Sequence, residues 1–558
     1  MRIISIMIAV LGFSLSVVAM DSMVPDTTKD QNLTVQMTQA RVKFQSDNFQ
    51  GALRIYRDLY KESPNHTMLN YRMGETYFQI EEYGSVILHL KKLVNEDDKN
   101  MELLHYYLGR AYQKESIFNL AKDHYETFKD NAKSKLVKYY NVPTYLAQVK
   151  NAIALISKEV EVEIENMGEK INSEYVDAVP SITADQTQLV FTSRRPLDKT
   201  VQRDPFTGEY FDAVFVSHKQ QDGSWSEAKP IAGDINTEWH DANTSISPDG
   251  KTIYLYKNIK NETLSGDIYA SKLKDGKWMK PQPLPENKPE EFFMKLGNAF
   301  KTLHQGETAI NSTYFETSAS VTADNNTIYF ISERKKGIGE GDIWMAHRAG
   351  KGWSTPKNLG KNINTENDEI GVFIHPDGNT LFFSSNGPSS MGGYDVFMVK
   401  KVDGRWQKPV NLGYPINTPD NEYHFVLSTD SKTAYISSDR EGGLGKVDLY
   451  QIDMRKYFDN LGVEFIQPEL TVVKGSVVAE DQTPIETEIV IKTKADGEIV
   501  TTIMSDEEGK YMATLKNGLT YEFIIEYQGM KPVNSTLVIL AGNEAKEVKT
   551  WHFILSKQ

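Results

Sequence analysis

The sequence predicts a multidomain protein with an N-terminal α-helical repeat array, a central five-bladed β-propeller and a C-terminal β-sandwich. Three observations support this prediction. A helical pattern recurs at a period of 34 and then 35 residues between residues 33 and 130, and an Ile-Asn phrase recurs five times between residues 171 and 417. The last ninety residues alternate apolar and polar side chains, which is typical of half-buried strands. A chain of 558 residues is also too long for a single core.

Composition excludes two classes of partner. Charged residues make up 25% of the chain and aromatic residues 11%, as in globular proteins, and the net charge is −14. This charge repels nucleic-acid phosphates and anionic lipid surfaces. We therefore expect no nucleic-acid binding and no polybasic contact with a membrane.

The first residues have the pattern of a secretory signal peptide. Arg2 precedes an apolar run of about 14 residues, and small residues follow and end at Ala19. We therefore expect a signal peptide at residues 1–19 and an exported protein. The chain has no cysteine, so neither a disulfide nor a lipid on an N-terminal cysteine is expected, and no direct membrane insertion is predicted.

Residues 33–157 are predicted to form the helical array. Its units begin at Ala40, Gly74 and Gly109, and each contains an aromatic residue at the same place. These aromatic residues are Phe49, Tyr83 and Phe118. The pattern resembles three tetratricopeptide repeats, with residues 142–157 as a closing helix; a generic helical bundle is the alternative. The resemblance implies a concave groove that binds peptides or partner helices.

Residues 158–457 contain the Ile-Asn phrase and are predicted to form the propeller. The five asparagines are Asn172, Asn236, Asn311, Asn364 and Asn417. Thirteen residues after each comes an aspartate: Asp185, Asp249, Asp324, Asp377 and Asp430. We interpret both sets as structural residues of turns. Strand-like segments and Trp-x-x-Pro edges follow, so each repeat should contain four short strands that must stack on their neighbours to bury both faces. The Ser-Pro-Asp-Gly and His-Pro-Asp-Gly turns resemble those of TolB-like propellers.

The fifth repeat has no Trp-x-x-Pro edge, whereas residues 159–172 precede the first repeat at the place where such a strand belongs. We therefore predict that a strand near residues 159–167 completes the fifth blade.

A carboxylate lies eight residues before each turn aspartate. The five are Asp177, Asp241, Glu316, Glu369 and Glu422. Equivalent positions of a propeller lie around its axis, so these residues form a candidate ring that points toward one end of the central channel and could hold a cation. The interpretation that we favour is that each acid hydrogen-bonds the backbone of a neighbouring loop.

Residues 469–558 are predicted to form the β-sandwich, with turns at Gly497, Gly509 and Gly518. The segment Gly509-Lys510-Tyr511 resembles the hallmark of carboxypeptidase regulatory-like domains, which are spacers or docking domains. No G-x-S-x-G, HExxH or P-loop motif occurs, and the histidines are scattered. We therefore expect no enzyme, no catalytic residue and no cofactor.

The order of the three modules resembles the periplasmic proteins associated with the type IX secretion system, although their OmpA-like domain and lipid-bearing cysteine are not found in this sequence. The resemblance implies a periplasmic scaffold or adaptor, peripherally associated with the outer membrane. It would serve an outer-membrane secretion or surface-assembly system, with an outer-membrane β-barrel or secretion component as partner. The alternative is a glycan- or muropeptide-binding protein. Clustered exposed aromatic residues in residues 194–212 and 289–300 would favour this alternative, and a broad apolar groove in the array would favour the adaptor.

Overall fold

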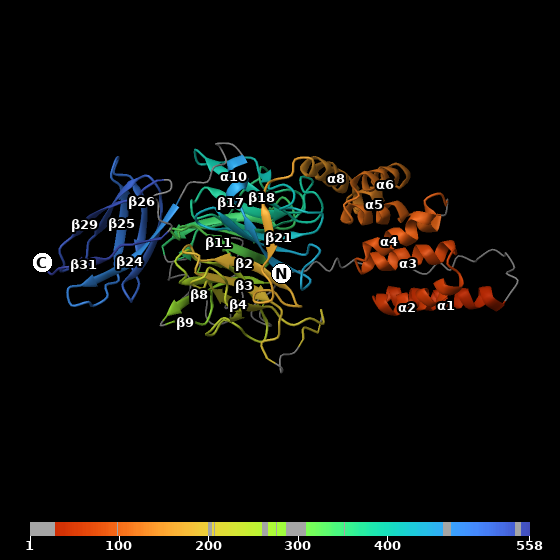
Figure 1. Ribbon diagram of the computed structural model, residues 1–558, viewed down its shortest axis with the longest axis horizontal. Helices are drawn as coiled ribbons and strands as arrows, with labels where there is room; N and C mark the ends of the chain where they lie inside the picture. The colour runs from red at the N-terminus through yellow and green to blue at the C-terminus, as the bar shows by residue number, and fades with distance from the viewer. Residues whose placement is uncertain are drawn as a thin grey trace, which may run out of the picture. The chain divides into compact units, whose positions relative to one another are not determined.

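The computed structural model describes residues 28–96, 99–198, 203–205, 207–258, 266–274, 276–285, 309–350, 352–460, 470–541 and 548–558. The chain divides into two compact units, Met1–Ala154 and Leu155–Gln558. The first is helical and the second is rich in β-structure, which confirms the prediction of a multidomain protein with an N-terminal helical region (Figure 1). The predicted signal peptide lies outside the described residues.

The helical region consists of helices joined by short turns. Its elements are α1 (Thr28–Gln45), α2 (Phe49–Glu62), α3 (Thr67–Gln79), α4 (Tyr83–Leu90), η1 (Lys91–Leu93), η2 (Lys99–Met101), α5 (Leu104–Lys114), α6 (Phe118–Asn131), α7 (Ser134–Tyr139) and α8 (Val142–Ile156). From α1 to α6, each helix contacts the next helix along the chain. The short helix α7 was not predicted.

Two glycines explain how closely the helices of a pair approach. A Cβ atom on Gly74 of α3 would lie 2.3 Å from the side chain of Leu90 in α4. A Cβ atom on Gly109 of α5 would lie 2.7 Å from the ring of Tyr125 in α6. The recurrent small residue of the sequence pattern is therefore a contact point between paired helices.

Five antiparallel sheets follow, which we call repeats 1 to 5. Repeat 1 contains β2 (Asp177–Ile182), β3 (Gln188–Ser193), β4 (Ala213–His218) and β5 (Lys229–Pro230). Repeat 2 contains β6 (His240–Ile246), β7 (Thr252–Asn258), β8 (Asp267–Lys274), β9 (Lys277–Trp278) and β10 (Gln282–Pro283). Repeat 3 contains β11 (Glu316–Val321), β12 (Thr327–Ser332), β13 (Asp342–Ala349), β14 (Gly352–Trp353) and β15 (Lys357–Asn358). Repeat 4 contains β16 (Glu369–Ile374), β17 (Thr380–Ser385), β18 (Asp395–Val402), β19 (Arg405–Trp406) and β20 (Val410–Asn411). Repeat 5 contains β21 (Glu422–Leu427), β22 (Thr433–Ser438), β23 (Asp448–Asp453) and, from before repeat 1, β1 (Glu163–Asn166).

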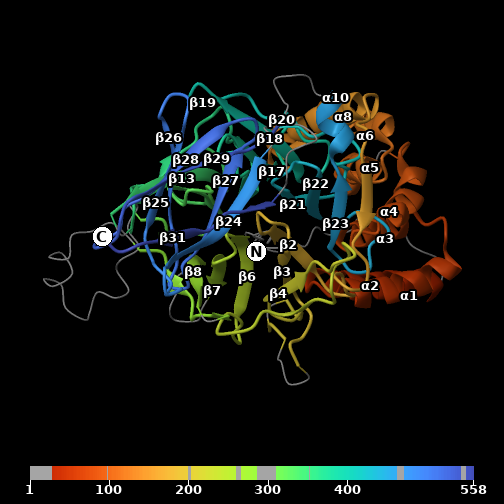
Figure 2. The same ribbon diagram turned by 60° about the vertical axis from the view of Figure 1, so that its left-hand side comes forward.

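The first strands of the repeats lie next to one another. β2 contacts β6, β6 contacts β11, β11 contacts β16, β16 contacts β21, and β21 contacts β2. A cavity of about 30 Å³ is lined by residues from all five strands or their ends, among them Ser181, Ser245, Ser320, Phe373 and Leu427. In Figure 1, β2 lies toward the middle of this region and β3 and β4 lie successively farther from it. Figure 2 shows the same sheets from a second direction.

Strand β1 pairs antiparallel with β23, so that Glu163 is opposite Asp453 and Asn166 is opposite Tyr450. The fourth strand of the fifth sheet therefore comes from the segment in which we predicted it. The sequence pattern missed one feature of this region. In repeats 2 to 4 the outer edge is divided into two short strands that both pair with the third strand.

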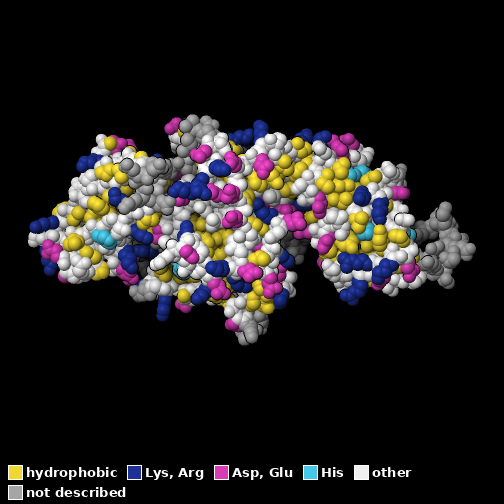
Figure 3. All heavy atoms as spheres, in the orientation of Figure 1, with side chains coloured by type: hydrophobic (Ala, Val, Ile, Leu, Met, Phe, Trp, Pro, Cys, Tyr) yellow, Lys and Arg dark blue, Asp and Glu magenta, His cyan; other side chains and the backbone are white. Residues whose placement is uncertain are grey.

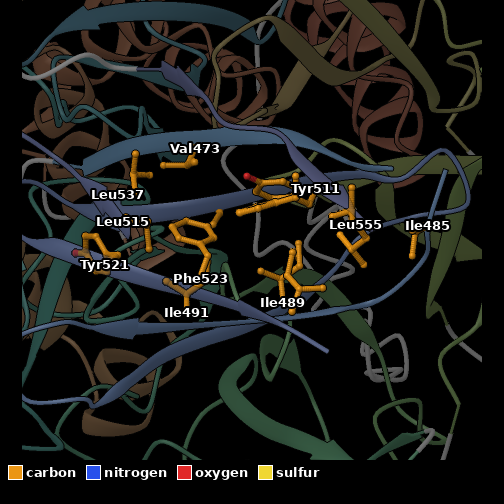
Figure 4. Close-up of a cluster of buried hydrophobic side chains, with 14 of the residues drawn as sticks. Val473, Ile485, Ile489, Ile491, Tyr511, Leu515, Tyr521, Phe523, Leu537 and Leu555 are labelled. Carbon is orange, nitrogen blue, oxygen red and sulfur yellow. The ribbon is translucent and has the colours of Figure 1, made fainter. Parts of the chain in front are cut away.

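The helix α10 (Arg455–Asn460) precedes a C-terminal β domain. Its strands are β24 (Leu470–Ala479), β25 (Glu488–Thr493), β26 (Ile499–Met504), β27 (Lys510–Lys516), β28 (Thr520–Ile525), β29 (Val533–Val538), β30 (Val548–Thr550) and β31 (Phe553–Leu555). Two four-stranded sheets enclose one core (Figure 4), in which Tyr511, Phe523 and Ile489 point toward one another. β30 and β31 pair parallel with β24, a feature that the alternating pattern did not predict.

Candidate functional site

The five carboxylates of the candidate ring are fully buried at the starts of the first strands. Each accepts hydrogen bonds from the backbone N–H and the hydroxyl of the residue four positions earlier. The donors are Ser173, Thr237, Ser312, Thr365 and Thr418. In repeat 1 both distances from Ser173 to Asp177 Oδ2 are 2.7 Å. Each acid therefore holds the loop that leads into its own strand.

Four of the five carboxylates also face a cation. The Arg195 guanidinium donates to Asp177 at 2.6 Å, Arg334 donates to Glu316 at 3.2 Å, and Arg440 donates to Glu422 at 3.1 Å. In repeat 2 the ammonium group of Lys257 donates to Asp241. The same cations donate to the backbone carbonyl of the repeated isoleucine, as Arg440 does to Ile416 O at 2.7 Å. The sequence analysis missed these cations, although an arginine stands eighteen residues after the acid in repeats 1, 3 and 5.

The surroundings of the five acids agree with the interpretation of local hydrogen bonding. Within the described ranges, no three His, Cys, Asp or Glu side chains lie close enough to hold a metal ion. Each carboxylate is enclosed by its own loop and, in four repeats, by its own cation, which favours local hydrogen bonds over a shared cation site. That the acids form a ring stays a prediction. Burial raises the pKa of Glu369 to about 7 against the hydrogen bonds from Thr365, and burial also raises that of Glu422 to about 7 although Arg440 opposes the change.

The five repeat asparagines connect neighbouring sheets. The side-chain amide of each donates to a backbone carbonyl of the preceding sheet's third strand and accepts from the N–H of the same residue. For Asn364 these bonds join Ile343, at 3.1 Å and 2.9 Å, and for Asn417 they join Val396, at 2.9 Å and 2.7 Å. The partners of Asn172, Asn236 and Asn311 are Leu449, Val214 and Ile268. The side-chain amide thus makes the pair of hydrogen bonds that a residue of a neighbouring strand would make, and it links one repeat to the next.

The five repeat aspartates lie in the turns between the first and second strands. Asp185, Asp249, Asp324, Asp377 and Asp430 each accept a hydrogen bond from the backbone N–H two residues later. In four repeats a Ser or Thr hydroxyl two residues earlier donates to the same aspartate, as Ser247 does to Asp249. These bonds are typical of Asx turns.

A second group of polar side chains lies between repeats 1 and 2. Asp212 is buried, accepts from Arg194 Nε at 2.8 Å, and lies 2.8 Å from His240 Nδ1. Arg194 also donates to Glu209, and Asp204 Oδ2 lies 3.8 Å from His240 Nε2. Burial alone would raise the pKa of Asp212, but the charge of Arg194 and the hydrogen bond from His240 hold it below its ordinary value.

Half-buried aromatic residues surround this group. The ring of Phe211 lies edge-on to His240 at 4.9 Å and to Trp239 at 6.1 Å. Tyr210 lies beneath the guanidinium of Arg203 at 4.5 Å. We call Asp204, Asp212, His240, Phe211 and Trp239 the aromatic–acid cluster. Asp204, Phe211 and Asp212 belong to the first of the two segments named in the sequence analysis, residues 194–212, and residues 289–300 lie outside the described residues.

The helical region carries exposed apolar side chains. Those at least 39% exposed are Val35, Val42, Leu88, Ile117, Leu120, Tyr139 and Ile153. Figure 3 shows hydrophobic side chains gathered on the face of this region that is turned to the viewer, with Lys and Arg beside them. None of the helices in the described part of the chain combines the length and the apolar composition that a membrane crossing requires.

No protein-family model and no curated protein matches the chain. Solved structures match parts of it at low similarity. TolB from Acinetobacter baumannii is 14% identical over 56% of this chain and 70% of its own, with a TM-score of 0.30. An α-L-arabinofuranosidase from Podospora anserina is 14% identical over 50% of this chain and 90% of its own, with a TM-score of 0.31. A 3-chlorocatechol 1,2-dioxygenase from Rhodococcus opacus is 12% identical over 16% of this chain and 61% of its own, with a TM-score of 0.14. Similarity this low establishes neither a family nor an activity.

These matches correct the expectation that the chain is no enzyme, because structures of enzymes are among them. That expectation depended on missing sequence motifs. Glycoside hydrolases use two carboxylates that any two elements of a fold can supply, so they need no common linear motif. The exclusion of catalysis is withdrawn, and the matches assign no activity in its place.

Proposed function

We propose that this protein is a periplasmic adaptor that links components of an outer-membrane secretion or surface-assembly system. In this proposal the helical region is a tetratricopeptide array and binds a segment of a partner protein. The five sheets are the blades of one closed propeller, and β1 completes the fifth blade. The pairing of β1 with β23 and the contact between β2 and β21 support closure. The signal-peptide pattern at residues 1–19 supports export.

The observation that carries the adaptor proposal is the set of exposed apolar side chains on the helical region. Ile117 and Leu120, at the start of α6, are 43% and 42% exposed. Burying such side chains against a partner contributes about 25 cal/mol per Å², less the cost of ordering the partner segment. The helical region is a compact unit of its own, so it can present this surface as a separate module.

Capture of envelope proteins by the purified chain tests this proposal. We expect the full chain to retain an outer-membrane protein, and a chain lacking residues 28–154 to lose it. The double variant Ile117→Asp and Leu120→Asp should also weaken capture. The matched control changes Ile499 and Val500 of β26, which are 63% and 43% exposed, to Asp. Equal capture by the two double variants would show that the array surface is not the binding site.

The aromatic–acid cluster favours a second candidate function, which is binding of a glycan or muropeptide. Sugars are bound by aromatic rings that stack on their apolar faces and by charged groups that hydrogen-bond their hydroxyls. Phe211 and Trp239 could supply the rings, and Asp204 and His240 the polar groups, within one place on repeats 1 and 2.

Calorimetric titration with muropeptides and with neutral oligosaccharides tests the second candidate. Binding should be lost on Trp239→Ala and Phe211→Ala. The control Tyr527→Ala removes an aromatic ring that is 42% exposed in the C-terminal domain, and it should leave binding unchanged. Absence of heat from every ligand with the unmodified chain would exclude this function for the ligands tested.

A further inference from the structure

Repeat 4 differs from repeats 1, 3 and 5 at one position shortly after its second strand. Arg195, Arg334 and Arg440 stand two residues after the last residue of the second strand in repeats 1, 3 and 5, and the residue at this position in repeat 4 is Gly387. One backbone hydrogen bond at this position is shared with repeat 3. Gly387 N–H donates to Ser385 Oγ at 3.2 Å, and Arg334 N–H donates to Ser332 Oγ at 3.2 Å.

Repeats 3 and 5 show that the atoms around this position can bind a guanidinium group. In repeat 5, Nη2 of Arg440 donates to Glu422 Oε1 at 3.1 Å and to Ile416 O at 2.7 Å, and Nη1 donates to Pro415 O at 3.3 Å. In repeat 3, Arg334 makes the same bonds to Glu316, Ile310 and Ala309. One carboxylate and two successive carbonyls thus match the planar fork of a guanidinium.

The equivalent acceptors in repeat 4 are the Glu369 carboxylate and the carbonyls of Asn362 and Ile363, which we call the repeat-4 acceptor site. Glu369 accepts from Thr365 Oγ1 at 2.7 Å and Ser385 Oγ at 2.8 Å. Across the described ranges of the chain, no Lys, Arg or His nitrogen lies within 4.0 Å of this carboxylate. The residue with the largest charge effect on it is another acid, Asp342. The local charge therefore favours an added cation.

The position also borders the surface. The side chains of Arg195 and Arg440 are 17% and 13% exposed, so an arginine side chain in this place is partly exposed in repeats 1 and 5, whereas that of Arg334 in repeat 3 is 2% exposed. Beside Gly387, Pro388 and Ser389 are exposed.

We propose that the repeat-4 acceptor site binds the guanidinium group of an arginine side chain presented by a partner polypeptide. The arginine takes the place that Arg195, Arg334 and Arg440 fill from within the chain. Its charge neutralises Glu369, and its fork bonds the carbonyls of Asn362 and Ile363. This site is independent of the surface proposed for the helical region.

The test measures binding of blocked arginine, N-acetyl-arginine amide, to the full chain by calorimetry at constant ionic strength. Blocked citrulline has nearly the same shape without the charge, and blocked lysine has the charge without the fork. We expect arginine to bind more tightly than lysine, and citrulline not to bind. A short arginine-containing peptide distinguishes a side chain within a polypeptide from a free guanidinium compound, and it should bind at least as tightly as blocked arginine.

Three variants locate the binding. Glu369→Gln should weaken it by about 30-fold or more, because the charged partner is lost from a buried site. The control Glu366→Gln changes an exposed neighbouring acid and should have no effect. Gly387→Arg should abolish binding and raise the urea midpoint of the protein, because the chain then supplies its own guanidinium.

The Gly387→Arg variant also shows whether the acceptors are available. A Cβ atom on Gly387 would lie 3.2 Å from Thr365 Oγ1 and 3.3 Å from Ser385 Oγ, so only small shifts are needed. A lowered urea midpoint, equal binding of citrulline, or no binding of arginine to the unmodified chain would each overturn the proposal.

Discussion

Asn172 is hydrogen-bonded through its side-chain amide to both backbone groups of Leu449, which lies 277 residues later in the chain. Leu449 N–H donates to Asn172 Oδ1 at 2.8 Å, and Asn172 Nδ2 donates to Leu449 O at 2.9 Å. The other four repeat asparagines make this connection to the sheet that immediately precedes them. Asn172 makes it from the first repeat to the last.

The substitution Asn172→Ala should destabilise the repeat region, because it removes the acceptor of the buried Leu449 N–H and one of the two donors to Leu449 O, which keeps the bond from Met167 N–H. We expect the free energy of unfolding to fall by about 1–3 kcal/mol. Urea unfolding followed by tryptophan fluorescence measures this change. Asn379→Ala removes an exposed turn asparagine and should change stability by less than about 0.5 kcal/mol. Similar losses in both variants would contradict a special role for the amide of Asn172.

The substitution Gly109→Ala should destabilise the helical region, because the added methyl group would lie 2.7 Å from the Tyr125 ring. We expect a loss of about 1–3 kcal/mol, measured by thermal unfolding followed by circular dichroism at the helical band. Gly84→Ala is the control, since its Cβ atom would have its nearest neighbour at 3.6 Å. The helical propensity of alanine should make this control neutral or slightly stabilising.

Stability should decrease as pH rises toward 8. The pKa of Glu369 and of Glu422 is raised by burial from 4.5 to about 7 in the folded protein. The folded state therefore binds more protons than the unfolded state between these values, and the stability present at low pH is lost as pH rises through the folded pKa. The slope is at most about 1.4 kcal/mol per pH unit for each group.

The pH effect is best measured as a difference between proteins. As pH rises from 5 to 8, the urea midpoint of the unmodified chain should fall relative to that of Glu369→Gln. Buried histidines such as His424 contribute equally to both proteins, so their effect cancels in the difference. A constant difference from pH 5 to pH 8 would show that Glu369 keeps an ordinary pKa.

The C-terminal domain allows a test of backbone strain against steric contact. Gly509 and Gly497 both have a positive φ, 73° and 76°, so alanine is strained at both positions. At Gly509, however, a Cβ atom would lie 2.3 Å from Val477 O, whereas nothing lies within 4 Å at Gly497. Gly509→Ala should therefore lower the unfolding free energy by about 1–3 kcal/mol more than Gly497→Ala, measured by thermal unfolding. Equal effects would mean that the strand pair moves apart at little cost.

The predictable part of this molecule is the part that repeats. The helical period placed Gly74 and Gly109 at equivalent positions, and both are helix contacts in the structure. The Ile-Asn phrase located the asparagines, but their bonds to the preceding sheet could not be derived from one repeat, because the partner residue belongs to another. The β30 and β31 strands were missed for a related reason, since each has three residues and depends on parallel pairing with β24.

The candidate site was harder to predict. The aligned acids suggested a common ring, but alignment along the sequence does not show which groups surround each acid. The missing information was the segment that follows the second strand, where Arg195, Arg334 and Arg440 recur and where repeat 4 has Gly387 instead. The aromatic–acid cluster joins residues of repeats 1 and 2 that are not part of the recurring pattern, so periodicity could not indicate it. His240 and Asp212 are 28 residues apart and meet only in the folded chain.

The connection between α8 and β1 has a mechanical consequence. α8 ends at Ile156, and β1 begins at Glu163. Tension along the chain from the helical region would reach this segment first. Val160 N–H donates to Tyr414 O at 2.8 Å, and β1, which follows it, is paired through its four residues with β23. The Val160 bond would therefore be loaded before the β1 ladder, and loss of both would leave the last sheet without its fourth strand.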